Sequence, residues 1–475
     1  MPIPRTGDFT GFVKTGVHTQ VGPVRSHIAG FVRESTINGI SYLININFKF
    51  NLQMKDILFL VLAGVLGFSC SSRGSAPKKS PLYVGASVRN ITPADSLFPF
   101  QGPHESRPYV GVHDSLYIRV VVLDNGAKRV VFAEMDEVSV PDHESMNAIA
   151  AHAADVSASD VVICSSHTHS TLHPGPELQD HLAFVKRQLR TAVSEAVRTL
   201  QPATVSFHRT SAFANVNNGE LNKGGAQYDE DSFSDKTLDI IGFRKRDGSP
   251  YALILNYSSH AEVMFRSVTK EGGYEISGDL PGRVAEIMRR YGWRAVLTTA
   301  GAEGDQQPLY TSSARTYKQG FVDQGEHGWA VLDVLAGRIA DKALLALEDT
   351  SRFDHEVALG IRRDTLYLPG QRYDRKTGKA RDTEDVAMTI AGIRLNDMAI
   401  FAVAADLAAG IGADVRRASP VSNTMLVTMM GGSVGYVLGD EAYKEPGHGA
   451  MGSKVKPGHA GNELVKGIKK ILDYE

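Results

Sequence analysis

The chain has 475 residues, of which 42% are hydrophobic and 22% are charged, as is typical of a globular protein with a sizeable core. The formal net charge is -2 and both signs are interspersed, which argues against a nucleic-acid-binding surface. Only two cysteines occur, Cys70 and Cys164, so the sequence excludes a disulfide framework and a zinc site built from thiolates.

The first part of the chain contains the pattern of a bacterial lipoprotein signal. Met54 and Lys55 precede an apolar run, Ile57–Phe68, which is too short to span a bilayer comfortably but fits the hydrophobic region of a secretory signal. The end of this run looks like a lipoprotein cleavage box, with Cys70 as the lipidated first residue of the mature chain. The alternative is a buried core segment that begins by chance with Met-Lys.

This pattern predicts four parts of the chain. A signal belongs at an N-terminus, so residues 1–53 are expected to be an upstream extension that is absent from the native protein. Residues 54–70 are the expected signal peptide, 71–81 a flexible tether, and 82–475 one large domain without an internal linker. The protein is therefore expected to be exported, periplasmic or at the cell surface, and anchored to a membrane through acylated Cys70.

From Leu82 onward, strand-like apolar runs alternate with helical stretches, which indicates a mixed α/β domain. Residues 124–126, Asp-Asn-Gly, are expected to close a hairpin between the first two of these strands. Apolar spacing predicts helices at 178–197 and 327–347, and a shorter helix after Pro281. Strands are expected at 117–123, 129–135, 161–164, 204–208, 238–243, 252–257, 295–300 and 399–405.

Several of these strands end in residues that can bind a metal. His167 and His169 follow the strand at 161–164 and point to the same side if the segment is extended. The strands at 252–257 and 295–300 are followed by further imidazole and carboxylate groups: His260, Glu303 and Asp305. Each feature alone is more often a loop or core residue, but together they suit a hard or borderline metal.

Six segments, taken in order, resemble the catalytic domain of the neutral/alkaline (non-lysosomal) ceramidases. They are VGASVRNITP, GVHDSLYIRVVVLDNGAKRVVFAEMD, ICSSHTHS, SDKTLDIIGFRKRDGSPYALILNYSSHAEVM, SGDLPGRVAEIM and GAEGDQQP. The resemblance runs from about Leu82 to the end of the chain. It implies a layered α-β-β-α fold of mixed sheets covered by helices, in a single large domain without the family's C-terminal immunoglobulin-like domain.

The resemblance also implies a zinc-dependent amidohydrolase that cleaves ceramide, a linear amide, into sphingosine and a fatty acid. In that case His169 would act as the base near the water bound to zinc, and Asp305 would orient a ligand or a polar group of the substrate. One zinc ion is implied, and its ligands would be His167, His260, Asp406 and Tyr436.

The positions that would line the substrate site depart from the family pattern more than the metal positions do. Asn218 stands where the family has arginine, Gln307 where it has serine, and Asp406 is one methylene shorter than the family's glutamate. The expected substrate is therefore ceramide or a related N-acyl lipid. Two alternatives stay open: a hydrolase of the same fold acting on a different amide or ester, and a catalytically silent lipoprotein that binds a ligand. The four expected lining residues are His113, Asp136, Asn218 and Gln307.

Overall fold

The structure, a computed structural model, describes residues 78–473 with short gaps. The gaps are 103–104, 173–175, 219–227, 230–231, 270–271, 317–319, 375 and 445–446. The expected extension, the signal peptide and Cys70 lie outside the described residues, and the described ones belong to one unit, Ser72–Glu475. No helix in the described part is long and apolar enough to cross a membrane.

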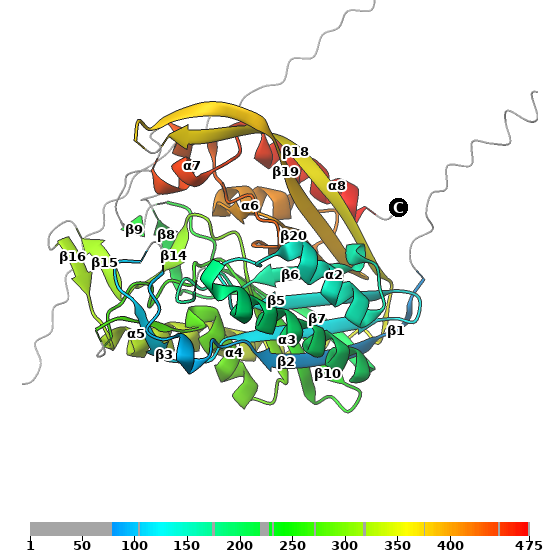
Figure 1. The fold of residues 1–475 in the computed structure, drawn as a ribbon. Coiled ribbons are helices and arrows are strands. Elements are labelled where there is room, and N and C mark those ends of the chain that lie inside the picture. The colour runs from blue at the N-terminus through cyan, green and yellow to red at the C-terminus, as the bar shows by residue number, and fades with distance from the viewer. Residues whose placement is uncertain are drawn as a thin grey trace, which may run out of the picture. The chain divides into compact units, whose positions relative to one another are not determined.

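The larger sheet has eight strands in the order β13-β11-β10-β7-β2-β4-β5-β6 (Figure 1). Most neighbours are antiparallel, but β5 pairs with β6 and β11 pairs with β13 in parallel. The bounds are β2 (Tyr83–Asn90), β4 (Tyr117–Asp124), β5 (Arg129–Met135), β6 (Val161–Ser165), β7 (Gln201–Ser211), β10 (Thr237–Lys245), β11 (Pro250–Tyr257) and β13 (Ala295–Ala300).

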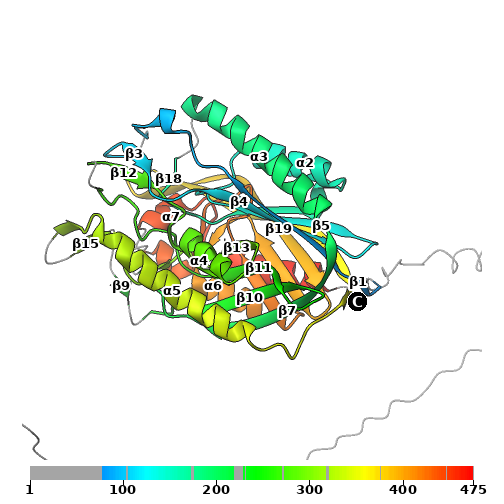
Figure 2. The ribbon, with the colours of Figure 1, turned by 90° about the horizontal axis from the view of Figure 1, so that it is seen from below.

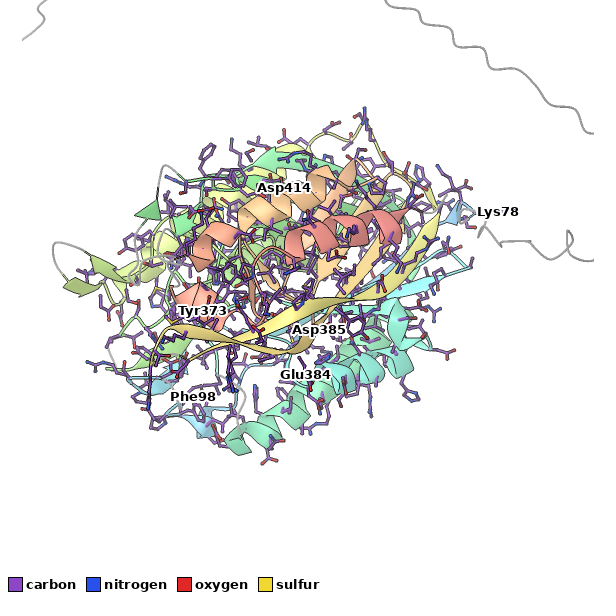
Figure 3. The ribbon with its side chains drawn as sticks, turned by 90° about the horizontal axis from the view of Figure 1, so that it is seen from above. Lys78, Phe98, Tyr373, Glu384, Asp385 and Asp414 are labelled. Carbon is purple, nitrogen blue, oxygen red and sulfur yellow. The ribbon has the colours of Figure 1, made fainter. Side chains whose placement is uncertain are left out.

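The smaller sheet has four strands in the order β18-β19-β20-β22. Its first two strands form a long hairpin that carries Tyr373 and the exposed Glu384 and Asp385, as seen from above in Figure 3. The next two strands, β20 and β22, run parallel. The bounds are β18 (Leu359–Asp374), β19 (Lys379–Leu395), β20 (Met398–Val403) and β22 (Asn423–Val427).

The main core lies between the two sheets. Phe132 of β5, Leu297 of β13 and Ile400 of β20 belong to one buried cluster there. Alternate residues of the larger sheet, such as Val131 of β5, face the opposite way and pack under helices. Because both faces of these strands are buried, their sequences are continuous apolar runs.

Helices cover the outer face of each sheet. Helices α2 (His143–Ala154), α3 (Gln179–Arg198), α4 (Asp279–Arg290) and α5 (His327–Leu347) pack on the larger sheet (Figure 2). On the smaller sheet, α6 (Ala409–Arg417) and α8 (Ala460–Leu472) bury residues such as Val415 and Leu464, while the short α7 (His448–Gly452) contacts β18. The helix–sheet–sheet–helix order confirms the expected α-β-β-α fold in a single domain.

Short strands complete the described fold. Ser80 and Pro81, at the end of the expected tether, already pair in β1 with β17. The short strands are β1 (Ser80–Pro81), β3 (Tyr109–Val112), β8 (Asn215–Asn218), β9 (Tyr228–Asp229), β12 (Tyr274–Ile276), β14 (Gln306–Pro308), β15 (Ser313–Thr316), β16 (Gly320–Asp323), β17 (Glu356–Val357), β21 (Asp406–Leu407) and β23 (Tyr436–Val437).

Three parallel pairs bring the ends of distant strands together. A helix links the strands of each pair: α2 between β5 and β6, α4 between β11 and β13, and α6 between β20 and β22. In the larger sheet, β2 joins β7 only through Tyr83–Pro202 and Val84–Gln201, and β13 also lies near β4, β5 and β6. The candidate site is built from the residues that follow β6, β11, β13 and β20, at the carboxyl ends of these strands, as is common in α/β proteins.

Candidate metal centre

The loops that follow β6 and β11 are joined by their backbones. Thr168 forms a parallel bridge with Ala261, and the His169 amide donates to the Ala261 carbonyl at 3.1 Å. The Thr168 hydroxyl donates to the Ser277 carbonyl at 2.8 Å, which ties the first loop to the start of α4. This pairing of loops from two strands brings His167 and His169 up to His260.

The ring nitrogens of the three histidines meet in one cluster. His167, His169 and His260 each offer a nitrogen, and these nitrogens lie within 4.8 Å of one another. The Nε2 atoms of His167 and His169 are 3.2 Å apart. Asp406 Oδ2 lies 3.4 Å from His260 Nε2 and 3.9 Å from His167 Nε2, and the Tyr436 hydroxyl lies 3.4 Å from His260 Nε2. The four ligands expected from the sequence therefore lie together, with His169 beside them.

The other ring nitrogens are held by fixed acceptors. His167 Nδ1 donates to the Val138 carbonyl at 2.6 Å, and His260 Nδ1 donates to the Glu303 carbonyl at 2.9 Å. Because a carbonyl can only accept, the proton sits on Nδ1 and Nε2 can offer its lone pair to the cluster. His169 Nδ1 lies 3.3 Å from Glu262 Oε1. Such outer partners are typical of metal-binding histidines.

Asp406 and Tyr436 are placed by the parallel pairing of β21 with β23, in which they are directly opposite. The Asp406 side chain is buried, and its Oδ1 atom has no hydrogen-bond partner. Gly304 packs against it, since a Cβ there would lie only 3.0 Å from Asp406 Oδ1. A bare buried carboxylate oxygen beside three imidazoles is the environment that a cation would complete.

Burial and neighbouring charges set the protonation of the cluster. Burial, reinforced by His169 and His260, lowers the pKa of His167 to about 3, so this ring is neutral as a metal ligand must be. Burial also disfavours a charged His260, but the Asp406 carboxylate outweighs it and raises the pKa of His260 well above its usual range, so a metal ion would have to replace the proton on Nε2. Burial raises the pKa of Tyr436 well above its usual range.

The donor set fits a divalent metal such as zinc. Ligand atoms about 2.0–2.1 Å from one tetrahedral ion lie about 3.3 Å from each other. Among the expected ligands, the separation of 3.4 Å between His260 and Asp406 is close to this value, and that of 3.9 Å between His167 and Asp406 is somewhat longer. The group combines imidazoles with a carboxylate and no thiolate, which suits zinc and its neighbours in the series. The assignment of His167 as ligand and His169 as base stays a prediction.

Asp305 acts on the backbone around the cluster. Its Oδ1 accepts from the amide of Ala409, at the start of α6, and from Gln306 Nε2, each at 2.8 Å. A carboxylate at the N-terminus of a helix satisfies free amides and is favoured by the helix dipole. Burial raises the pKa of Asp305 above its usual range. Asp305 thus holds the start of α6, which follows the Asp406 segment in the chain. The expected role of Asp305 in orienting a ligand stays a prediction.

The expected lining residues lie in different surroundings. His113 stacks on Trp329, with ring centroids 3.5 Å apart. Asp136 is fully buried and accepts from Arg119 at 2.7 Å, as part of an ion-pair group inside the fold. The backbone amide of Asn218 donates to the backbone carbonyl of Asp305 at 2.6 Å, which fixes the end of β8. Gln307 lies in the centre of β14 opposite residue 216. Contact of these residues with a substrate stays a prediction.

Two further carboxylates interact with the cluster: Glu262, which was not predicted from the sequence, and Glu303, which the sequence placed only among several groups that can bind a metal. Glu262 lies two residues after His260, and the same-side spacing of an extended segment was the signal that could have identified it. Glu303 follows β13 and is fully buried. Burial raises the pKa of Glu303 well above its usual range, although the charge of His260 acts in the opposite direction and lowers this pKa.

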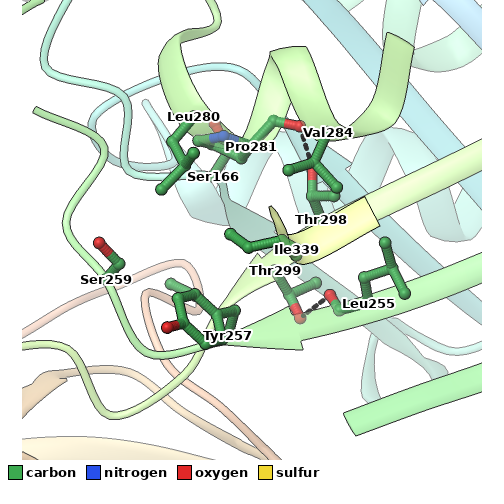
Figure 4. Close-up of a pocket in the computed structure, with 11 residues that line it drawn as sticks. Ser166, Leu255, Tyr257, Ser259, Leu280, Pro281, Val284, Thr298, Thr299 and Ile339 are labelled. Atoms are coloured by element: carbon green, nitrogen blue, oxygen red, sulfur yellow. Dashed lines mark hydrogen bonds between the residues drawn. The ribbon is translucent and has the colours of Figure 1, made fainter. Parts of the chain in front are cut away.

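A small cavity lies beside the histidine loops (Figure 4). Ser166 and Ser259, the neighbours of His167 and His260, give it a polar side, and the Ser166 hydroxyl is buried without a partner. The cavity has a volume of about 30 Å³ accessible to the centre of a water molecule, which is enough for about two water molecules. Apolar side chains complete the lining: Leu255, Leu280, Val284 and Ile339.

The fold and the cluster define a class, an α-β-β-α protein with a candidate metal centre where its parallel strands end. Among solved structures, the chain is similar to the neutral ceramidase from Pseudomonas aeruginosa, with a TM-score of 0.63 and 15% sequence identity over 82% of this chain and 74% of that one. A structure of a ceramidase complexed with C2 is similar at 0.63 and 14%, over 83% and 75%. No protein-family model matches the chain, and no curated protein sequence does. At such identities the likeness shows a shared fold.

Proposed function

We propose that the protein is a zinc-dependent hydrolase that cleaves the amide bond of ceramide or a related N-acyl lipid. The observation that carries the proposal is the clustering of His167, His260 and Asp406: Asp406 Oδ2 lies 3.4 Å from His260 Nε2 and 3.9 Å from His167 Nε2, and the two histidines offer nitrogens within 4.8 Å of each other. The fold shared with two ceramidase structures supports the choice of an amide substrate. In this proposal Tyr436 completes the set of protein ligands.

The zinc ion, His169 and Glu262 have different roles in the proposed reaction. Bound zinc supplies Lewis-acid activation of a water molecule and of the substrate carbonyl. His169 is more exposed than its neighbours, with 17% of its side chain accessible against 9% for His167 and 6% for His260. It therefore faces the open side of the cluster, where Nε2 takes a proton and returns it to the leaving nitrogen. Glu262, near Nδ1, stabilises the imidazolium that forms.

Exposed apolar side chains around β8 and β14 support a lipid substrate. Phe213, Phe233 and Leu309 are 64%, 55% and 41% exposed. They belong to one region, because the Leu309 amide donates to the Ala214 carbonyl and Asn217 Nδ2 donates to the Phe233 carbonyl, each at 2.8 Å. Single exposed hydrophobic residues are ordinary, but three on neighbouring segments favour an apolar ligand.

The direct test is hydrolysis of a panel of N-acyl lipids, with ceramides of several chain lengths and ester analogues, by the purified protein. Wild type should release the fatty acid from ceramide, and His167→Ala should not. His152→Ala, which removes an exposed histidine of α2, is the matched control and should retain activity. Turnover of another amide or an ester but not ceramide would replace the substrate. Metal binding without any turnover would contradict the hydrolase and favour a ligand-binding protein.

We also propose that the chain is an exported bacterial lipoprotein anchored through Cys70. The support is the sequence pattern around Met54–Cys70. Cys70→Ser should abolish incorporation of labelled fatty acid and move the protein from the membrane fraction to the soluble fraction. An unchanged distribution between the two fractions would contradict the anchor.

A further inference from the structure

Glu303 is a buried carboxylate that the proposed function does not use. Its exposed fraction is 0%, and neither carboxylate oxygen has a hydrogen-bond partner. The Oδ1 atom of Asp406 is the third buried carboxylate oxygen in the described residues without a partner. Buried polar atoms are almost always hydrogen-bonded, so three unpartnered oxygens on two residues require an explanation.

The backbone fixes Glu303 between two of the proposed ligands. Its carbonyl accepts from His260 Nδ1 at 2.9 Å. The amide of the next residue, Gly304, donates to the Leu407 carbonyl at 2.7 Å and packs against the Asp406 carboxylate. The charges of His260 and Asp406 act on the Glu303 carboxyl, and its charge in turn acts on Tyr436. The Glu303 backbone thus contacts the loop of His260 and lies beside the segment of Asp406, and its carboxyl group interacts electrostatically with both side chains.

The balance of charge around the cluster is negative. Among the described residues, the ion pairs of Glu262 and Asp406 are with histidines alone, and Glu303 has none. An isolated buried carboxylate is strongly unfavourable unless it is neutralised or binds a cation. One divalent ion carries two positive charges, which two carboxylates would balance. Among the proposed ligands Asp406 is the only carboxylate, while Glu262 contacts His169.

We propose that the Glu303 carboxylate is a metal-binding group of this centre, the second carboxylate donor beside Asp406. The proposal rests on the proposed metal function and adds a residue to it. It accounts for the three unpartnered oxygens with a single bound cation. It also explains why so many acidic groups are tolerated around three imidazoles without a lysine or arginine partner among the described contacts. Adding a hard oxygen donor raises the preference for ions such as Mn²⁺ and Co²⁺ relative to a set with fewer oxygens.

The alternative is a carboxyl group that burial keeps neutral and that only fills space. Glu303→Gln separates the two possibilities, because glutamine has the shape of the neutral acid but lacks the charge that binds a cation. Glu303→Met, which is also close in volume, provides a second variant if the amide is poorly accommodated. Asp239→Asn is the matched control: Asp239 is equally buried, but its carboxylate is paired with Arg209 on β7.

The experiment titrates the purified, metal-free proteins with Zn²⁺ and Co²⁺ in competition with a chromogenic chelator and records the visible absorption of the Co²⁺ form. Glu303→Gln and Glu303→Met should bind Zn²⁺ at least about tenfold more weakly than wild type, as expected for a donor or its close partner. They should also change the Co²⁺ bands, which report the number and type of donor atoms. Asp239→Asn should retain both properties.

Two results would overturn the role of Glu303: unchanged Zn²⁺ affinity in both variants, or weaker affinity with unchanged Co²⁺ bands, which would make Glu303 an outer residue. The melting temperature of each metal-free variant shows that it is folded, and removal of an unpaired buried acid should not lower it. Failure of wild type to bind either ion would instead contradict the metal centre itself, so the two failures are distinguishable.

Discussion

Glu137 gives a quantitative test of the electrostatics behind the cluster. It follows β5 and precedes Val138, whose carbonyl holds His167. Its side chain is buried, and burial, with a smaller contribution from Asp136, raises its pKa from 4.5 to about 8. Between these values the folded protein keeps a proton that the unfolded chain has lost. Stability therefore falls as pH rises from about 4.5 to about 8, and the full penalty is present above that range.

The size of this penalty follows from the two pKa values. Their difference is about 3.5 pH units, and at 1.36 kcal/mol per unit the upper bound is about 5 kcal/mol. Glu137→Gln keeps the shape of the protonated acid and cannot ionise. The variant and wild type should unfold at similar urea concentrations near pH 5. Near pH 9 the variant should be more stable by about 2–5 kcal/mol.

Urea unfolding followed by circular dichroism at pH 5, 7 and 9 measures this difference. The control is Glu144→Gln, which removes an exposed glutamate of α2 and should leave the pH dependence of stability unchanged. A difference between Glu137→Gln and wild type that stays constant from pH 5 to pH 9 would refute the assignment of a protonated acid at this position.

Three further predictions concern the cluster. Gly304→Ala places a Cβ 2.9 Å from the Leu407 backbone carbon and 3.0 Å from Asp406 Oδ1, so the segment that carries this carboxylate must shift. Zn²⁺ affinity should therefore fall about tenfold or more in a chelator competition, and unchanged affinity would show that the close packing is unimportant. Glu262→Gln should retain zinc by elemental analysis but lower kcat about 10–100-fold, because His169 loses its partner; an unchanged kcat would exclude that role. Removal of metal with a chelator should lower the melting temperature and added Zn²⁺ should restore it, since about a hundredfold excess over Kd contributes about 2.7 kcal/mol; no shift would argue against binding to the folded state.

The pattern of apolar residues predicted those strands and helices whose position depends on the local sequence alone. The strands at 129–135 and 295–300 and the helix at 327–347 are found with the expected bounds, because long apolar or amphipathic runs determine them. The hairpin of β18 and β19 was not predicted, since residues 379–385 are exposed and do not alternate. Helix α2 was missed because alanine-rich segments have a weak apolar pattern.

Part of the candidate site could also be predicted from local sequence patterns. His167, His169 and His260 each follow an apolar strand, so the rule that strand ends assemble sites identified them. Asp406 and Tyr436 came only from the family resemblance, because the pairing of β21 with β23 that brings them together is non-local. The partner of Asp136 depends on the register between β4 and β5, which places Arg119 opposite residue 134 and is not visible in the sequence.

The most direct test of the account is the metal content of the purified protein. Elemental analysis of wild type should find about one zinc ion per chain, while His167→Ala and His260→Ala should each lose it and the exposed-histidine control His152→Ala should retain it. Wild-type protein that stays folded but takes up no divalent metal, even after incubation with Zn²⁺, would contradict the central claim that these histidines and Asp406 form a metal centre.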